Sequence, residues 1–541
     1  MDFVGRFLFL VCIPWSRNRS SVLWITDIVC RGIPGNVHGN YGNLYQDAEN
    51  RIYCGWNYTI DPGSGSVPND VSLFYEVLQT DIGLRCGSTG NLSGDRGRVV
   101  ISNGCLEIDS SPIGGRHYEE VVIMFKCDEK RMEDKITTYS KFGDAGHGGI
   151  TRYSLSPEAL QARAEFVRRM KAIGAEIKSD DMACLYATLK GSEPELPGII
   201  MGSHCDSVKN GGNYDGILGV LSAMEVLETV ATNNIPHKHN LTAMIWTNEE
   251  GSLYPPSMMA SGVLCYDYLP EDIRYKFVHK DMLASKSILD PTKTFGMALE
   301  ASGYKGDKEN RINPKDYKAM FELHIEQGPI LEAENKDVGV VTCVLGMICY
   351  RIRTYGQADH AGTTPMKYRH DAFYASAKVL QYLHDELDKL DPELVYTTGE
   401  IVLHPNVHTV IPDYVDFSID ARHEKPEVIE QVVKVIENMP KEVAGCKVDF
   451  EPAWTRDTVY FDKELVGYVQ EAVDELGYSN QKINSGAGHD AQFCAYMLPT
   501  TMIFVPSKDG HSHCEPEFTS VKQCTQGASV LLNAVLKCDA K

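Results

Sequence analysis

The chain has 541 residues, 43% hydrophobic and 23% charged, which excludes a wholly disordered protein, a collagen and a coiled coil. Its 52 Lys and Arg against 74 Asp and Glu give a net charge of −22, which argues against binding nucleic acid or an anionic membrane through a general electrostatic field. No apolar run reaches the roughly 18 residues of a transmembrane helix. At about 150 residues per domain, the length predicts roughly three to four domains.

Residues 1–130 differ from the rest in composition, being rich in Gly, Ser, Asn and Cys. Short runs such as Val71–Leu78 and Arg98–Ile101 predict a β-rich region, plausibly a small sandwich, of unknown role. Six of the 16 cysteines and the sequons at Asn57 and Asn91 lie here and favour secretion. The other ten cysteines are scattered singly, which favours a reduced, cytoplasmic location for the remaining part.

From about residue 137, predicted helices and strands alternate, which indicates an α/β domain. Ser156-Pro157 starts a helix that Gly174 ends, and residues 216–230 predict a second one. Four short apolar strands each run into polar residues: Ile199–Ser203, Leu241–Thr247, Met320–Leu323 and Met502–Val505. In open α/β sheets, sites are built at this end of the strands.

Residues 337–452 break this rhythm. They predict strand, helix, strand, strand, helix and strand, an order typical of a ferredoxin-like split β-α-β domain. The predicted elements are Val340–Tyr355, Ala372–Leu390, Thr398–Leu403, Tyr414–Ala421, Pro426–Asn438 and Lys447–Glu451. We expect this domain to be inserted into a larger one that comprises residues 137–336 and 453–541.

The segment GSHCDSVKNGGNYDG, residues 202–216, offers metal ligands around a glycine-rich turn. His204 and Asp215 are of the residue types that bind Zn²⁺ or Mn²⁺. Asp206 is placed to accept the ring N–H of His204 that does not face the metal. The alternative is a polar loop that only caps the helix beginning at Gly216.

The segment TNEEG, residues 247–251, places two adjacent carboxylates after a strand. One of Glu249 and Glu250 can bind a metal while the other stays unligated and acts as general base toward an activated water. The alternative is a solvated acidic turn.

Two more segments complete the candidate site. HIEQG, residues 324–328, supplies His324 and Gln327, and GHSHCEPE, residues 510–517, supplies either His511 or His513. A single buried histidine is more often structural, but four strand ends with ligand-type residues support one another. The set then holds five ligands, with a shared aspartate bridging two ions about 3.5–4 Å apart.

These motifs, spread over residues 137–538, resemble the amidase branch of the binuclear zinc aminoacylase and carboxypeptidase family. That branch includes N-carbamoyl-amino-acid hydrolases, β-ureidopropionase of the yeast and bacterial type, allantoate amidohydrolase and ureidoglycolate amidohydrolase. The short spacing from His204 to Asp215 and the segment HIEQG favour this branch over the peptidases. The resemblance implies a zinc-peptidase-like α/β catalytic domain, an inserted ferredoxin-like α+β lid and dimerisation domain, a homodimer, and two divalent ions, Zn or Mn, per subunit.

The resemblance also implies the ligand sets. One metal is bound by His204, Asp215 and His324, and the other by Asp215, Glu250 and His513. His513 is preferred to His511 because Ser512 and Glu515 match the motif around the family's ligand. Glu249 matches the general base.

On the substrate side, the resemblance implies that His360, in GQADHAGTTP, enters the partner's active site and stabilises an oxyanion. Arg422 matches the anchor of the substrate carboxylate. Gln327, Gly488 and His489 match residues near the substrate. Thr409 stands where the branch commonly has a substrate-binding Asn, and this departure concerns the identity of the substrate.

The expected activity is hydrolysis of the ureido C–N bond of a small carboxylate, such as an N-carbamoyl amino acid or allantoate, with release of ammonia. One alternative is an aminoacylase or dipeptidase of the same family. The alternative from another class is a metal-free binding protein, and the presence of all five ligands and Glu249 argues against it.

Overall fold

The computed structural model describes residues 121–541, with side chains from Met124, and before them the backbone of seven short strands. These strands are β1 Phe7–Val11, β2 Leu23–Ile28, β3 Leu44–Gln46, β4 Ile52–Gly55, β5 Phe74–Glu76, β6 Gly97–Ser102 and β7 Cys105–Ile108. The sandwich expected for residues 1–130 lies outside the described residues. Among those described, no helix combines the length and apolarity needed to cross a membrane.

The larger domain is built on a nine-stranded mixed sheet with the order β11-β12-β14-β13-β15-β25-β16-β23, with β24 also paired to β16. Its strands are β11 Glu176–Ser179, β12 Leu185–Leu189, β13 Gly198–His204, β14 Leu241–Trp246, β15 Tyr317–Ile325, β16 Val338–Val344, β23 Val459–Tyr460, β24 Asn480–Ser485 and β25 Thr500–Val505. Two outer strands, β9 Asp144–Gly146 and β10 Gly149–Ile150, form a hairpin. Strand β8, Val121–Lys126, precedes the first helix.

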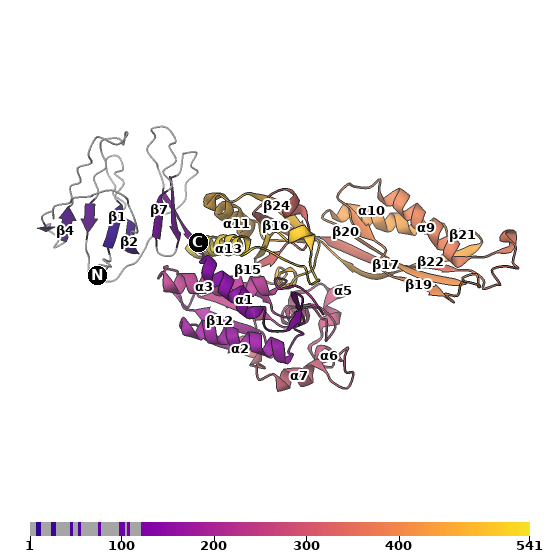
Figure 1. Cartoon of the computed structure of the whole chain (residues 1–541), viewed down its shortest axis with the longest axis horizontal. Helices are drawn as coiled ribbons and strands as arrows, with labels where there is room; N and C mark the ends of the chain where they lie inside the picture. Colours follow the sequence, from indigo (N-terminus) through magenta and orange to yellow (C-terminus); the bar gives the residue numbers. More distant parts are fainter. Residues whose placement is uncertain are drawn as a thin grey trace.

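Helices cover both faces of this sheet, so the domain has three layers (Figure 1). On one face lie α1 Glu129–Tyr139, α2 Pro157–Ala172, α3 Ile217–Thr232, α11 Lys463–Leu476 and α13 Val521–Ala540. On the other lie α4 Met259–Leu264, α6 His279–Leu283, α7 Phe295–Ala301 and α12 Asp490–Cys494, with the short α5 Glu271–Arg274 beside them and α8 Ile330–Ala333 after β15. Alternating side chains of β13 enter the two cores, Ile199 and Met201 on one face and Ile200 on the other.

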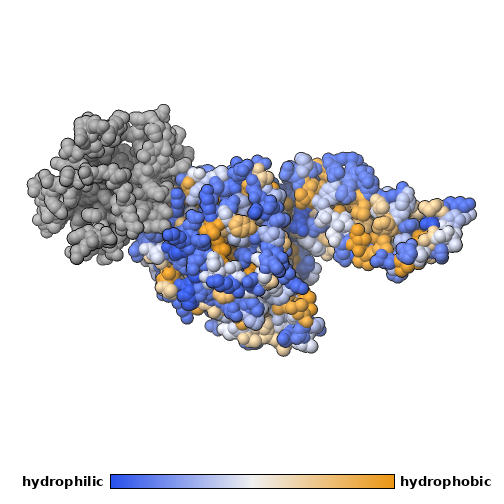
Figure 2. All heavy atoms as spheres, in the orientation of Figure 1, coloured by the Kyte–Doolittle hydropathy of each residue, from blue (hydrophilic) through white to orange (hydrophobic). Residues whose placement is uncertain are grey.

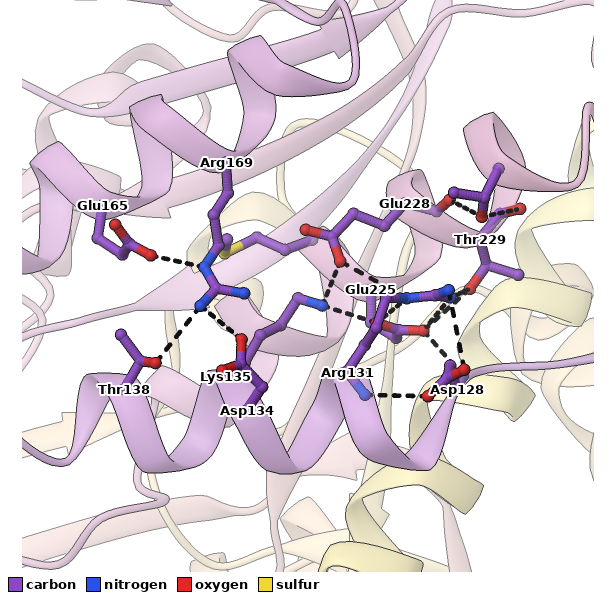
Figure 3. Close-up of polar contacts among 12 residues, drawn as sticks. Asp128, Arg131, Asp134, Lys135, Thr138, Glu165, Arg169, Glu225, Glu228 and Thr229 are labelled. Carbon is purple, nitrogen blue, oxygen red and sulfur yellow. Dashed lines mark hydrogen bonds and ion pairs between the residues drawn. The ribbon is translucent and has the colours of Figure 1, made fainter. Parts of the chain in front are cut away.

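Helix α1 is fixed to α3 by a buried cluster of charged groups (Figure 3). Lys135, fully buried, donates to Glu225 at 2.7 Å and also to Glu228. Arg131 donates to the second oxygen of Glu225 at 2.6 Å. The backbone N–H of Asp128 donates to the same oxygen at 2.8 Å. Because α3 begins directly after the candidate ligand Asp215, this cluster connects the start of the domain to the segment that carries the candidate ligands.

The core of the larger domain begins before the expected residue 137, which falls inside α1. Met124, Cys127 and Met132 are buried with α3, α11 and α13. The backbone of Phe125 exchanges hydrogen bonds with the side chain of Asn533 at 3.0 and 2.7 Å. This packing could not be predicted from the sequence of α1, because the helix is rich in charged residues and only one of its faces is apolar.

The inserted domain carries the expected strand and helix order. Its elements are β17 Gly346–Tyr355, α9 Ala372–Leu387, β18 Val395–Thr397, β19 Ile401–His404, β20 Tyr414–His423, α10 Pro426–Glu437, β21 Glu442–Val443 and β22 Cys446–Arg456. The antiparallel sheet has the order β18-β20-β17-β22-β21, with β19 also on β20, and α9 and α10 pack on it. Figure 1 shows this domain extending away from the larger one.

The single strand expected at Val340–Tyr355 was wrong. It is two strands in different sheets, because β16 pairs with β25 and β24 and the chain then crosses to β17 at Leu345. The return crossing follows β22, so the inserted domain spans residues 346–456 rather than 337–452. The two crossings are adjacent, since the N–H of Gly346 donates to Oγ1 of Thr458 at 3.1 Å.

Candidate metal centre and substrate-binding residues

Four adjacent parallel strands, β14, β13, β15 and β25, end at the same edge of the large sheet. His204 is the last residue of β13, and His324 lies near the end of β15. Glu250 follows β14 and His513 follows β25. The edge expected from the sequence therefore does gather the candidate ligands.

Asp215 lies at the centre of this cluster. Its Oδ1 is 3.6 Å from Nε2 of His204 and 3.3 Å from Nε2 of His324. Its Oδ2 is 3.1 Å from Nε2 of His513, which in turn is 3.6 Å from Oε2 of Glu250. One carboxylate thus faces two groups of ligands, as a residue that bridges two metal ions would.

Hydrogen bonds orient the two buried imidazole rings. Nδ1 of His204 lies 3.0 Å from the carbonyl oxygen of Asp206, and Nδ1 of His324 lies 2.9 Å from that of Ile325. Each Nδ1 therefore carries the proton and donates it to a carbonyl, which leaves a lone pair on Nε2. The backbone N–H of Gly216 donates to Nε2 of His324 at 3.1 Å, in agreement with this tautomer.

Asp206 does not act on His204 through its carboxylate, as the sequence led us to expect. The carboxylate oxygen is 3.9 Å from Nδ1, too far for a hydrogen bond, because the turn after β13 presents the backbone carbonyl to the ring instead. The carboxylate accepts the backbone N–H groups of Glu249 at 3.4 Å and Glu250 at 3.2 Å. Asp206 therefore joins the loops that follow β13 and β14.

Glu517 is a buried member of the site that the motifs did not identify. Its Oε1 accepts the backbone N–H groups of Tyr214 at 2.9 Å and Asp215 at 3.0 Å, and its Oε2 accepts the hydroxyl of Ser512 at 3.2 Å. It ties the loop of Asp215 to the loop of His513. Glu515, singled out by the motif comparison, packs on Gly149 instead. Spacing alone could not rank the two glutamates of CEPE.

Burial and crowding change how the carboxyl groups ionise. Burial raises the pKa of Glu249 and of Glu250 well above the usual range, and the negative charges of neighbouring carboxylates raise it further. Burial also opposes ionisation of Asp215, but the neighbouring imidazole groups of His324 and His513 outweigh it and hold that pKa well below its usual value. Positive charge brought to this cluster would relieve the repulsion.

The donor set fits two divalent cations. Two groups of potential ligands share Asp215, and within each group the ligand atoms lie within 4.8 Å of one another: His204, Asp215 and His324, and Asp215, Glu250 and His513. Imidazole nitrogen with carboxylate oxygen is the donor chemistry of Zn²⁺ and Mn²⁺ sites. The buried Oε1 of Glu250 has no hydrogen-bond partner within the part of the chain that the structure describes, as expected for an oxygen that binds a cation. His511 is outside both groups.

Glu249 is outside the two groups that share Asp215, but it forms a further group of possible ligands with His204 and Glu250. Its Oε2 is 3.6 Å from Nε2 of His204, and its side chain is buried. Gln327 also contacts the centre, because its Nε2 donates to Oδ2 of Asp215 at 2.8 Å and to the hydroxyl of Ser512 at 3.1 Å. The sequence placed Gln327 near the substrate, and the structure places it on the central carboxylate.

Arg422 reaches from the inserted domain to the loop that follows β24. Its Nη1 donates to the carbonyl of Gly486 at 2.6 Å, while Nε and Nη2 donate to Asp420 at 2.8 and 3.3 Å. Two residues beyond Gly486 comes Gly488, and the next, His489, is buried with its ring centroid 4.6 Å from that of His324. The carboxylate anchor expected at Arg422 thus lies one short loop away from the ligands.

His360 and Thr409 lie together on an exposed loop of the inserted domain. The N–H of Ala361 donates to the carbonyl of Thr409 at 2.9 Å, and the backbones of His360 and Val410 form an isolated antiparallel β-bridge. Among the described residues, no contact joins this loop to the ligand cluster of the same chain. Both residues were selected from the sequence. The sequence did not predict that they lie side by side, or that they lie apart from the ligand cluster.

A profile of peptidase family M20/M25/M40 matches residues 200–537, which include all five candidate ligands. The chain is 36% identical to an N-carbamoyl-L-amino-acid amidohydrolase of Rhizobium meliloti, over 76% of this chain and 97% of that protein. The chain belongs to the M20/M25/M40 family. The resemblance seen in the sequence is thereby confirmed.

Two further similar proteins agree with this placement. An allantoate amidohydrolase of Bacillus subtilis is 33% identical over 75% of this chain and 97% of its own length. The crystal structure of a hydantoinase/carbamoylase family amidase from Burkholderia multivorans has a TM-score of 0.70 and 35% identity, and the match covers 77% of this chain and 99% of that one. Both domains of the fold therefore fall within matches to proteins named an amidohydrolase and an amidase.

Gly216 is expected to be essential for the metal centre. A Cβ there would lie 2.1 Å from the ring of His204, and the φ of +65° is strained for any other residue. Gly216→Ala should therefore displace this ligand and weaken metal binding by about 10–100-fold, the usual effect of disturbing a ligand's support. Metal content after dialysis, measured by mass spectrometry, tests this.

Gly467→Ala is the matched control, because nothing lies within 4 Å of a Cβ at that helical position. It should keep a normal metal content. Full metal retention in Gly216→Ala would contradict the assignment of His204 as a ligand.

Proposed function

We propose that the protein is a metal-dependent amidohydrolase that cleaves the ureido C–N bond of a small carboxylate, such as an N-carbamoyl amino acid or allantoate, and releases ammonia. The observation that carries this is a complete set of five ligands around Asp215 with an additional, buried carboxylate, Glu249, beside it. The similarity to N-carbamoyl-L-amino-acid and allantoate amidohydrolases supports the choice of a ureido bond.

Two divalent ions, Zn or Mn, would be held by this set. His204 and His324 would bind one, Glu250 and His513 the other, and Asp215 both. Such ions lower the pKa of a bound water and polarise a carbonyl oxygen, which is the chemistry that ureido hydrolysis needs.

Glu249 moves the proton. As a carboxylate it accepts a proton from the attacking water, whose oxygen then forms a bond to the ureido carbon. It returns that proton to the departing nitrogen, so the C–N bond breaks and ammonia leaves. Spontaneous loss of carbon dioxide from the remaining carbamate frees the amino group. Its buried position holds Glu249 at one place through both transfers.

Arg422 and the loop after β24 hold the other end of the substrate. The guanidinium group presents parallel N–H donors that suit a carboxylate. This explains how a chain of net charge −22 binds an anion. Because Asp420 and the Gly486 carbonyl now occupy most of these donors, substrate binding requires Arg422 to release Gly486.

His360 serves the active site of a second copy in this proposal, and Thr409 accompanies it. Strand β17 starts at the crossing between the domains and has ten residues, so its far end, five residues before His360, lies about 30 Å from that crossing. Apolar side chains are exposed on α9 and on the edge strands β18 and β19, namely Phe373, Tyr374, Val395, Ile401 and Val402. Figure 2 includes apolar surface on this domain, which supports a homodimer formed through residues 346–456.

Mixing two inactive variants tests the shared site. Glu249→Gln and His360→Ala should each be nearly inactive, and a refolded equal mixture should recover about a quarter of wild-type activity, because half the sites in each mixed dimer are intact. No recovery, with dimers confirmed by light scattering, would place His360 in its own subunit's site, and near-normal activity of His360→Ala alone would place it outside catalysis.

Ammonia release by the Mn²⁺- or Zn²⁺-loaded protein tests the proposed activity. The panel contains N-carbamoyl-β-alanine, N-carbamoyl-L-amino acids, allantoate and ureidoglycolate, with N-acetyl amino acids and dipeptides followed by amine release. Turnover of a ureido compound that chelation abolishes is the expected result. Activity only on acyl or peptide bonds would make the protein an aminoacylase or dipeptidase.

We also propose that the catalytic part works in a reducing compartment. Eleven cysteines between Cys127 and Cys538 are free thiols in the described part of the chain, and nine of them are buried.

A further inference from the structure

Two arginines stand at the same level of the inserted sheet. Arg422 of β20 is opposite Met347 of β17, and Met347 is opposite Arg456 of β22. Directly opposite residues on antiparallel strands point to the same face. Both guanidinium groups therefore leave the sheet on one face, at its end nearest the larger domain.

Both guanidinium groups also meet the segment between β24 and α12. Arg422 donates to the carbonyl of Gly486, and Nη1 of Arg456 donates to Oε1 of Gln492 at 2.7 Å. His489, whose ring contacts that of the candidate ligand His324, lies between these two points in the chain. Arg456 is therefore close to the site although no motif contains it.

The charges of the two arginines are balanced differently. Arg422 has a carboxylate partner in Asp420. Arg456 is 9% exposed and forms no ion pair among the residues that the structure describes, where its buried Nε also has no hydrogen-bond partner. Burial, and then the like charge of Arg422, lower the pKa of Arg456 to about 10. A buried cation without a counter-ion is costly, so this position favours an anion.

Gly488 lies close to the guanidinium group of Arg456. A Cβ at Gly488 would lie 3.0 Å from Nη1 of Arg456 and 3.2 Å from Cε of Met258. Any side chain here would press on the guanidinium group. The absence of a side chain therefore lets the loop that borders the ligands lie directly against Arg456.

We propose that Arg456 is a second recognition residue for the substrate carboxylate, which it binds together with Arg422 across Gly488. This inference rests on the proposed function and deepens it, since it concerns the anionic end of the same substrate. Two guanidinium groups can donate hydrogen bonds to both oxygens of one carboxylate. The carboxylate of the substrate would then be the counter-ion that Arg456 otherwise lacks.

The test compares an anionic and a neutral ligand of nearly the same shape, N-carbamoyl-β-alanine and N-carbamoyl-β-alaninamide. Calorimetric Kd values are measured on metal-loaded protein in the Glu249→Gln background. Arg456→Met should weaken binding of the anion about 10–100-fold, as expected for lost charge-assisted hydrogen bonds, and leave the amide nearly unchanged. Arg456→Lys keeps the charge and should lose less.

Gly488→Ala is an independent probe, since it covers Arg456 without changing any charge. It too should weaken binding of the anion more than that of the amide. Equal losses for both ligands, or no loss in Arg456→Met, would overturn the proposal and leave Arg456 as a structural residue. Failure of the enzyme to hydrolyse any ureido compound would contradict the proposed function alone, because the binding comparison does not depend on turnover.

Discussion

Glu249→Gln is expected to lower kcat by about 10²–10⁴-fold while metal content stays at the wild-type level. The amide keeps the size and position of the side chain but cannot accept a proton from water. Because Glu249 is not in either of the two groups that share Asp215, its neutral replacement should leave those five residues in place. Steady-state ammonia release and metal analysis on the same preparation test both halves of the expectation.

Glu250→Gln is the matched comparison, since it changes the adjacent carboxylate in the same way. It should lose metal as well as activity, because Glu250 faces His513 and Asp215 in the second group. If Glu249→Gln lost metal and Glu250→Gln did not, the two roles would have to be exchanged. Near-normal kcat in Glu249→Gln would remove it as the base.

Lys135→Met is expected to lower the free energy of unfolding by about 3–5 kcal/mol, the usual cost of breaking a buried ion pair by removing one partner. Glu225 and Glu228 would keep only Arg131 as a cationic partner, and Glu225 is fully buried. Urea denaturation followed by circular dichroism measures the loss. A further expectation is weaker metal retention, because α3 leads directly from Asp215 into this cluster.

Lys389→Met is the control, since Lys389 pairs with Glu386 at 2.8 Å on the surface. Exposed ion pairs contribute little to the free energy of unfolding, so the urea midpoint of Lys389→Met should stay close to that of the wild type. A Lys135→Met protein as stable as the control would mean that the two glutamates are satisfied without Lys135, and that α1 is held by its apolar face alone.

The position of the site could be predicted because it depends on strand ends. Short apolar runs followed by His or Glu are local in sequence, and parallel strands bring their carboxyl ends together. His204, Asp215, Glu250 and His324 could accordingly be selected as candidates from the sequence, whereas the choice of His513 over His511 needed the family resemblance. The split β-α-β order of the inserted domain was equally readable, since each element has its own periodicity.

Other features depend on how distant segments meet, and sequence spacing does not contain that. The break is invisible because only Leu345 separates β16 from β17, and the two strands are distinguished by the sheets that they join. The part played by Asp206 depends on which atom the turn presents to His204. The proposed role of Arg456 depends on its register with Arg422 in the sheet and on its burial without a counter-ion among the described residues, and neither is written in the local sequence.

The two chain crossings at Gly346 and Thr458 are adjacent, so they can act as a hinge about which the inserted domain rotates. This hinge, the pivot of the rotation, lies next to Arg422, the proposed anchor of the substrate carboxylate. Arg422 and Arg456 sit at the pivot, and His360 sits beyond the far end of β17. A rotation of about 10° would move that far end by about 5 Å and the two arginines far less. Under the proposed function, substrate binding by the two arginines and the approach of His360 to the partner's site can therefore be separate steps, so variants that stiffen the pivot should lower kcat and leave KM almost unchanged.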